Sequence, residues 1–202
     1  YLIEEEQVAL VHPVKRGYAL RLSRPLPRHL KDEEVGRLLQ VIHDRRDRAL
    51  FRLMLRCGLR VEEVARLKLA ALDLRRRQLF VHYGKGAKDR VVYLSDDADE
   101  ALVQYLRVRP ASRVKEVFLV NKGRCWGQAI SVRGIQKRLE HYARQAKIKV
   151  SCHQLRHTMA TQLLNADADL VAIQDLLGHT RIKTTQRYCR VSNLKVQRDY
   201  FK

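Results

Sequence analysis

The chain has 202 residues, 46% of them hydrophobic, and its 41 Lys and Arg residues outnumber its 22 Asp and Glu residues to give a formal net charge of +19. This length suits one good-sized domain, or one domain plus a fragment of another, and no apolar run approaches the roughly 20 residues of a membrane span. The positive charge favours a polyanionic partner, because each neutralised phosphate releases counterions, although a merely solvated basic surface is the alternative.

The elements predicted along the chain are mostly helical. Residues 1–11 read as the end of a helix, and residues 12–28, rich in Arg and Pro, read as a linker into a new domain. Apolar residues then recur at helical spacing in segments 31–43, 45–57, 60–67, 96–108, 130–147, 151–165 and 169–177, and a last helix begins near 183.

Two segments have a different period. Residues 78–83 and 90–94 alternate like strands around the turn GKGAKD, which predicts a hairpin. The sequence therefore predicts an α+β fold, mostly α-helical, with a small antiparallel β-hairpin sheet.

The segment GLRVEEV carries the first candidate site residues. Arg60 follows Gly58, a helix stop, and Glu63 lies three residues on, so both side chains point the same way. An ordinary surface ion pair is the alternative for these two residues.

The hairpin tip carries the second candidate site. Its glycines permit a tight turn and close approach to a ligand, and they leave Lys85 projecting from the loop. The tip is not a phosphate-binding P-loop, which requires Gly-Lys-Ser/Thr at the start of a helix. A solubilising turn lysine is the alternative.

The third and most specific pieces are SCHQLRHTMATQLL, LLGH and TTQRY. Ser151 and Gln154 form a capping box, so a helix begins there, and His153 and Arg156 project from one face of its first turns. An apolar stripe of Leu155, Met159, Leu163 and Leu164 anchors this helix in the core. Its N-terminus is a favourable place for a phosphate. Gly178 ends the next helix and presents His179, and Tyr188 follows nine residues later.

In this order and spacing, GLRVEE, GKGAKDRVVYL, HQLRH, LLGH and TTQRY resemble the catalytic domain of the tyrosine recombinase (phage integrase) family. The resemblance covers about residues 27–190. It implies site-specific DNA recombination or integration through a 3′-phosphotyrosine intermediate, with double-stranded DNA as partner. It also implies these catalytic residues: Arg60, Lys85, His153, Arg156, His179 and the nucleophile Tyr188, with Glu63 in support.

The chemistry suits these residue types. Two guanidinium forks match the charge on a phosphoryl transition state, the histidines donate hydrogen bonds or accept the phenol proton, and Lys85 protonates the leaving 5′-oxygen. The arginines neutralise the charge, so we expect neither a metal nor a cofactor. The competing nucleophile, Tyr200, has no histidine at a suitable distance upstream.

The resemblance also implies the domain organisation. Residues 1–26 are expected to be the end of an N-terminal DNA-clamping domain plus linker, and residues 27–202 the catalytic domain with a C-terminal tail. Docking of such tails on neighbouring subunits implies a tetramer on DNA. We expect the protein in the cytoplasm, associated with the nucleoid when it is bound to DNA. Additional DNA contacts are expected from Lys88, Arg90, Arg133, Lys137 and Arg138, for which a solvated basic face is the alternative.

Other interpretations remain. A type IB topoisomerase uses similar chemistry, although the short spacing from LLGH to the tyrosine favours a recombinase. A DNA- or RNA-binding module that has lost catalysis has no use for the full set of six residues. The four cysteines form no Cys-x-x-Cys pair and indicate reduced thiols, with a zinc site of Cys152, His153 and His157 as the alternative.

Overall fold

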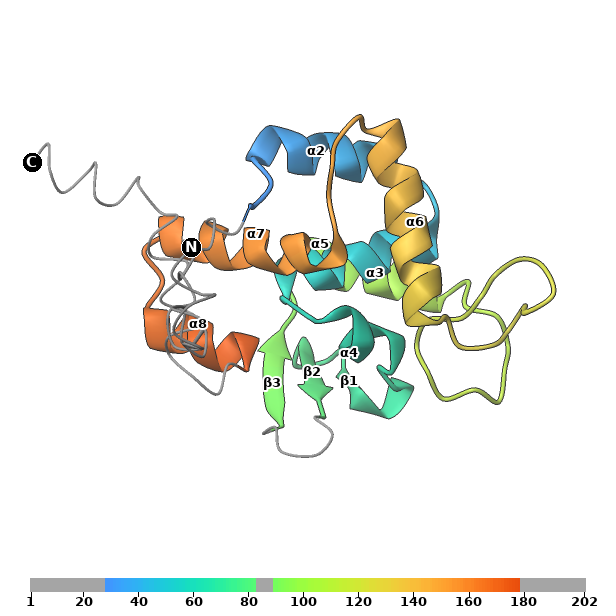
Figure 1. Cartoon of the computed structure of the whole chain (residues 1–202). Helices are drawn as coiled ribbons and strands as arrows, with labels where there is room; N and C mark the ends of the chain where they lie inside the picture. Colours follow the sequence, from blue (N-terminus) through green and yellow to red (C-terminus); the bar gives the residue numbers. More distant parts are fainter. Residues whose placement is uncertain (1–27, 83–88, 179–202) are drawn as a thin grey trace, which may run out of the picture.

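The computed structural model describes residues 28–82 and 89–178 (Figure 1). In chain order its elements are α2 (Asp32–Val41), α3 (Arg45–Arg56), α4 (Val61–Ala65), η1 (Leu69–Ala71), β1 (Leu72–Asp73), β2 (Gln78–Val81), β3 (Arg90–Tyr93), α5 (Asp96–Leu106), α6 (Val132–Gln145), α7 (Cys152–Asn165) and α8 (Leu170–Leu177). Each helix predicted within these ranges is present, and its ends lie within two residues of the predicted bounds. The segment 1–11, most of the linker 12–28 and the helix predicted near 183 lie outside the described residues.

Helix α3 is the centre of the core. Asp44 caps its start by accepting a hydrogen bond from the backbone of Asp47 (3.1 Å), and the helix packs against α5 and α7. Its apolar residues Leu50, Phe51, Met54 and Leu55 are each at most 1% exposed. Because most of its surface is covered by other helices, α3 provides a rigid base for the corner that follows it.

The small sheet lies below the helices in Figure 1. Strands β2 and β3 pair antiparallel with Leu79 opposite Val92, which confirms the predicted hairpin. Strand β1 adds a third, antiparallel strand on the other edge of β2, in the order β1-β2-β3. The sequence did not predict β1, because a strand of two residues is too short to show alternation.

Helices α7 and α8 form a pair that packs against the rest of the fold. The predicted capping box is present, since Gln154 Oε1 accepts from Ser151 N (2.7 Å) and Ser151 Oγ accepts from Gln154 N (3.4 Å). In the apolar stripe of α7, Leu155 and Met159 are buried, and Met159 packs with Ile173 and Leu177 of α8. Helix α8 also contacts β3, so its C-terminal end lies close to the sheet.

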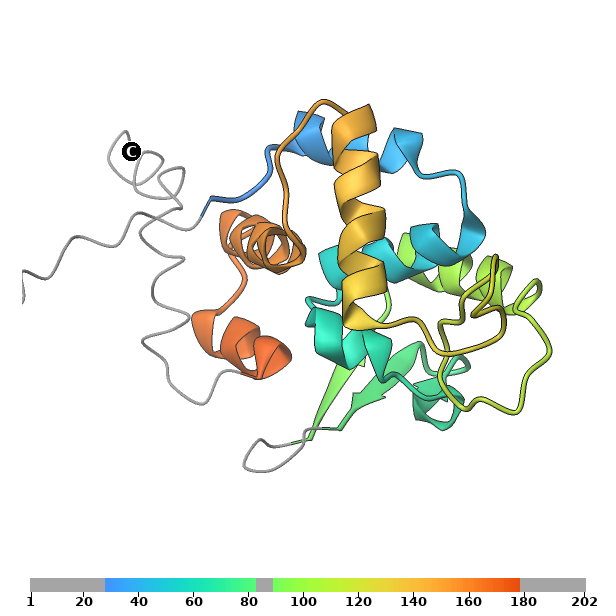
Figure 2. The same ribbon diagram turned by 45° about the vertical axis from the view of Figure 1, so that its right-hand side comes forward.

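A long connection of residues 107–131 leads to α6, which packs against α2 and α4 (Figure 2). No helix within residues 28–82 and 89–178 is long and apolar enough to cross a membrane.

Candidate active site

Arg60 lies at a corner between α3 and α4. Gly58 adopts a left-handed backbone (φ 62°), and Arg60 is the residue directly before α4. The backbone N–H of Arg60 donates to Glu63 Oε2 (2.9 Å), and its guanidinium donates to Glu63 Oε1 (2.9 Å). The spacing of three residues thus brings the two side chains together.

Glu63 is not half of an ordinary surface ion pair. Its side chain is 8% exposed, whereas that of Arg60 is 36% exposed. Arg90 of β3 donates to both carboxylate oxygens, from Nη1 to Oε1 (3.1 Å) and from Nη2 to Oε2 (2.8 Å). Burial alone would raise the pKa of Glu63, but the charges of Arg90 and Arg156 and the backbone hydrogen bond from Arg60 together hold the pKa below its ordinary value. Glu63 is therefore a buried anion held between two arginines.

Arg90, which the sequence predicts to be a DNA contact, is drawn into the fold. Its side chain is 6% exposed, and its Nε donates to the carbonyl oxygen of Leu176 (2.7 Å) at the end of α8. The cause is the alternation of β3, in which Arg90 and Val92 face inward while Val91 and Tyr93 face outward. Its bonds to Glu63 and to the Leu176 carbonyl favour a structural role for Arg90 over the predicted DNA contact.

Arg156 joins three separate segments. It lies on the second turn of α7 and is 2% exposed. One terminal nitrogen donates to the carbonyl of Gly58 (2.5 Å), and the other donates to the carbonyl of Leu177 at the end of α8. These bonds fix the plane of the guanidinium and hold the two chain corners together.

Two histidines pack on the exposed side of α7. The rings of His153 and His157 lie 4.1 Å apart between centroids, at an angle of 77°. Sequence reasoning gave His157 a place only in the zinc alternative, although the spacing of four residues already placed it beside His153. Cys152, His153 and His157 all lie within the described residues. Among those residues, no group of three or more His, Cys, Asp or Glu side chains is arranged to hold a metal ion.

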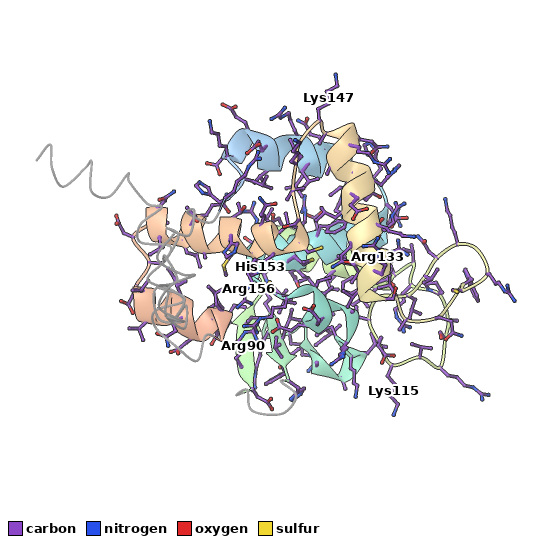
Figure 3. The ribbon with its side chains drawn as sticks, in the orientation of Figure 1. Arg90, Lys115, Arg133, Lys147, His153 and Arg156 are labelled. Atoms are coloured by element: carbon purple, nitrogen blue, oxygen red, sulfur yellow. The ribbon has the colours of Figure 1, made fainter. Side chains whose placement is uncertain are left out.

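Arg60, His153 and Arg156 line one cleft of about 540 Å³ between α4, α6 and α7. Figure 3 shows His153 and Arg156 with Arg133 of α6. The remaining lining residues are Val61, Glu62, Gln136, Leu139, Glu140, Val150, Ser151 and Cys152. Burial raises the pKa of the Cys152 thiol to about 11, so this thiol is protonated near neutral pH and is a poor nucleophile.

A second cleft of about 540 Å³ opens on the other side of Arg60. It is lined by Arg66, Lys68, Phe80 and His82, among others, and it also contains Glu63. Arg60 therefore stands at the junction of two clefts. Sequence reasoning did not identify this second cleft, because its walls come from α4, η1 and β2 and have no common motif.

Four of the predicted site residues lie outside the described residues: Lys85, Lys88, His179 and Tyr188. The structure describes the chain on both sides of the hairpin tip, where His82 Nδ1 and Asp89 Oδ2 lie 2.9 Å apart. It also describes the approach to His179, because Leu176 and Leu177 are held by Arg90 and Arg156.

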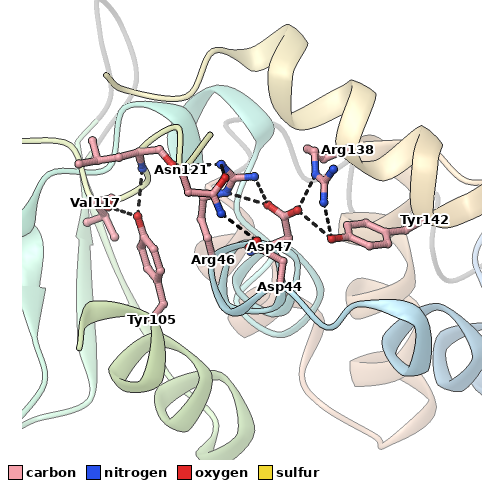
Figure 4. Close-up of polar contacts among 9 residues, drawn as sticks. Asp44, Arg46, Asp47, Tyr105, Val117, Asn121, Arg138 and Tyr142 are labelled. Carbon is pink, nitrogen blue, oxygen red and sulfur yellow. Dashed lines mark hydrogen bonds and ion pairs between the residues drawn. The ribbon is translucent and has the colours of Figure 1, made fainter. Parts of the chain in front are cut away.

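The basic residues of α6 fall into two groups. Arg133 and Lys137 are exposed, which suits the predicted DNA contacts. Arg138 instead turns inward, and its Nε donates to the fully buried carboxylate of Asp47 (2.6 Å) while its Nη2 donates to the hydroxyl of Tyr142 (2.6 Å) (Figure 4). These bonds favour a structural role for Arg138 over the predicted DNA contact.

The first cleft can bind an anion. Three arginines, Arg60, Arg133 and Arg156, reach it from separate elements, and the start of α7 brings the partial positive charge of a helix N-terminus. His153 adds an imidazole that can donate or accept a hydrogen bond. These groups suit a tetrahedral phosphate with developing negative charge.

Comparison with known proteins assigns the chain to a family. A family model described as "Phage integrase family" matches residues 28–195. "Tyrosine recombinase XerA" from Thermococcus kodakarensis is 41% identical over 174 residues, which cover 85% of this chain and 61% of the relative.

Solved structures agree in fold. A crystal structure of XerA recombinase matches with a TM-score of 0.79 and 30% identity, over 89% of this chain and 66% of that one. A structure of XerH recombinase bound to its difH substrate, before cleavage, matches with a TM-score of 0.69 and 27% identity, over 81% of this chain and 50% of that one. The chain therefore spans less than two thirds of the length of each of these relatives. Since the family model covers most of its residues, the resemblance drawn from the motifs is confirmed: the chain belongs to the phage integrase family, whose members here are tyrosine recombinases.

Proposed function

We propose that this chain is the part of a site-specific recombinase that cleaves and rejoins DNA through a 3′-phosphotyrosine intermediate. The observation that carries the proposal is the convergence of Arg60, His153 and Arg156 on one cleft. The names of the relatives, tyrosine recombinases XerA and XerC, support it.

In the proposed reaction the phenolic oxygen of Tyr188 attacks a backbone phosphorus of DNA. A bond forms between phosphorus and the tyrosine oxygen, the bond from phosphorus to the 5′-oxygen breaks, and the strand leaves with a 5′-hydroxyl. His153 or His179 accepts the phenol proton, and Lys85 donates a proton to the departing oxygen. Attack of another 5′-hydroxyl on the phosphotyrosine then reverses these steps and rejoins the DNA.

Arg60 and Arg156 stabilise the transition state in this proposal. Their N–H groups donate to the two non-bridging oxygens, on which negative charge accumulates. A donor of this kind contributes about 3–4 kcal/mol in comparable oxyanion sites. The carbonyl bonds of Arg156 and the carboxylate bond of Arg60 orient both groups before DNA binds.

The proposed partner is double-stranded DNA, and the XerH structure is a complex of a similar protein with its difH substrate. Arg133 and Lys137 extend from α6 beside the first cleft and supply backbone contacts. We further propose that residues 1–26 continue from a DNA-clamping domain, that the protein acts in the cytoplasm on nucleoid DNA, and that it works as a tetramer.

A covalent trapping experiment tests the proposal. The protein is incubated with a pool of nicked duplexes of randomised sequence, in which cleavage releases a short strand and prevents rejoining. We expect an adduct that survives SDS. Mass spectrometry should identify the peptide containing Tyr188 as the one linked to DNA. Tyr188→Phe abolishes the adduct while DNA affinity stays within a few-fold.

Tyr200→Phe is the matched control and retains the adduct. An adduct formed by Tyr188→Phe, or one mapped to Tyr200, refutes the assignment of the nucleophile. Absence of any adduct from the unsubstituted chain refutes the proposed activity.

A further inference from the structure

Arg90 connects two parts of the site that are far apart in the sequence. Its two terminal nitrogens bind both oxygens of Glu63 (3.1 and 2.8 Å), and its Nε binds the carbonyl of Leu176 (2.7 Å). One side chain thus reaches from the corner of Arg60 to the C-terminal end of α8, and 6% of it is exposed.

The end of α8 is held by two arginines. Arg90 binds the carbonyl of Leu176, and Arg156 binds the carbonyl of Leu177. The last carbonyls of a helix lack intrahelical partners and carry partial negative charge, so cations are favourable there. The same two arginines contact the α3–α4 corner, at Glu63 and at the carbonyl of Gly58 respectively.

Arg90 also competes with Arg60 for Glu63. An arginine paired with a buried carboxylate on both oxygens has much of its charge neutralised locally. Here Arg90 occupies this two-pronged position, whereas the guanidinium of Arg60 donates to Glu63 through one terminal nitrogen and remains 36% exposed at the clefts. Removing Arg90 would leave Glu63 to pair with Arg60 alone.

We propose that Arg90 is a positioning residue for phosphoryl transfer: by holding Glu63 and the end of α8, it directs the charge of Arg60 into the cleft. This inference rests on the proposed function, and it assigns to Arg90 a role through Arg60 and α8 instead of a contact with DNA.

The charged groups around Glu63 give the proposal a distinct pH signature. Arg60 and Glu62 belong to its own corner, Arg90 faces it from β3, and Arg156 and His153 lie on α7. Without Arg90 the burial of Glu63 is opposed by fewer charges, so the pKa of Glu63 rises. Protonation of Glu63 then releases its hydrogen bonds to Arg60 at a higher pH.

The experiment compares single-turnover cleavage of the trapping substrate by three variants. In Arg90→Gln the cleavage rate at saturating DNA falls by about a hundredfold, the effect expected for a small misplacement of a catalytic group. DNA affinity changes less than threefold. In a plot of cleavage rate against pH, the fall of the rate on the acidic side (the acidic limb) moves to higher pH. Arg90→Lys keeps the charge without the fork, so it restores the acidic limb and only part of the rate.

Arg109→Gln is the matched control. Arg109 is a half-buried arginine that donates to the backbone carbonyls of Val114, Glu116 and Val117 (2.8, 2.7 and 3.0 Å), and it lies outside both clefts. This variant loses stability as Arg90→Gln does, but at a temperature where both are folded its cleavage rate and acidic limb match those of the unsubstituted chain.

A rate loss in Arg90→Gln that only follows its folded fraction, with an unmoved acidic limb, overturns the inference. So does a full rate in Arg90→Lys, which remains measurable even where Arg90→Gln does not fold. Carbon-13 carboxyl titration of Glu63 by NMR is independent of cleavage, and an unchanged pKa of Glu63 in Arg90→Gln also overturns the inference. If the unsubstituted chain cleaves no DNA, the proposed function itself fails. If the unsubstituted chain cleaves DNA but the acidic limb of Arg90→Gln is unmoved, only the role of Arg90 fails.

Discussion

Gly58 is the residue on which the geometry of the cleft depends most directly. Its φ of 62° is unfavourable for any residue with a side chain, and a Cβ atom there would lie 2.9 Å from Leu177 Cδ2 and 3.2 Å from Met159 Sδ. The absence of a side chain therefore lets the α3–α4 corner approach α7 and α8. Its carbonyl is one of the two acceptors of Arg156.

We predict that Gly58→Ala lowers the free energy of unfolding by about 1–3 kcal/mol, because it adds both backbone strain and overpacking. Gly36→Ala is the control: nothing lies within 4 Å of its added Cβ in helix α2, so stability should rise by about 0.5–1 kcal/mol. Urea unfolding followed by circular dichroism measures both. Equal stabilities for the two variants would contradict the argument.

At the scale of elements, α6 is fixed to α3 by a buried polar network. Asp47 Oδ2 accepts from Arg138 (2.6 Å) and from the Tyr142 hydroxyl (2.9 Å), while Oδ1 accepts from Arg46 Nε (2.8 Å) (Figure 4). Burial and the charge of Asp47 raise the pKa of Tyr142 to about 12, so its hydroxyl remains a donor through the neutral range. The network sets the orientation of α6 and therefore the direction of its exposed basic face.

Two neighbouring cations on α6 should thus behave differently. Arg138→Ala removes the hydrogen bonds to Asp47 and to the Tyr142 hydroxyl and is expected to cost about 1–3 kcal/mol of stability, with little change in the salt dependence of DNA binding. Lys137→Ala leaves stability within about 0.5 kcal/mol, as for most surface substitutions, but lowers the slope of log K against log salt by about one unit if Lys137 contacts a phosphate. Chemical unfolding and fluorescence anisotropy at several salt concentrations separate the two effects. An unchanged slope in Lys137→Ala would remove α6 from the proposed DNA surface.

At the scale of the whole molecule, charge and incomplete length matter most. A net charge of +19 on 202 residues favours binding along many phosphates. The chain spans 61% of the length of the XerA relative. The proposed tetramer depends on the last residues of the chain, whose apolar side chains include Val191, Leu194, Val196 and Phe201.

Deletion of residues 192–202 tests the tetramer. We expect the shortened chain to bind and cleave a single DNA site, because all six proposed catalytic residues are retained, while paired complexes of two DNA sites no longer form. Native gel electrophoresis and analytical ultracentrifugation of DNA complexes distinguish single from paired sites. Intact pairing by the shortened chain would show that the tail is not the subunit contact.

The sequence alone was sufficient for the helices, for the pairing of β2 with β3 and for the family. The helices follow from apolar spacing, and the stops at Gly58 and Gly178 are confirmed by φ values of 62° and 59°. The spacing of Arg60 to Glu63 and of His153 to Arg156 was readable because residues three apart on a helix lie on one face. These features depend on neighbours within a few residues, which a sequence displays directly.

Only the tertiary structure decided which arginines find their partners inside the fold. Arg90, Arg138 and Arg156 look alike in the sequence, but their partners lie 27, 91 and 98 residues away, at Glu63, Asp47 and Gly58. Whether a guanidinium meets solvent or a buried carboxylate depends on how distant segments pack, and no local pattern records this. The physical reason is that burying a charge is costly without a partner, and the partner is supplied by the fold as a whole.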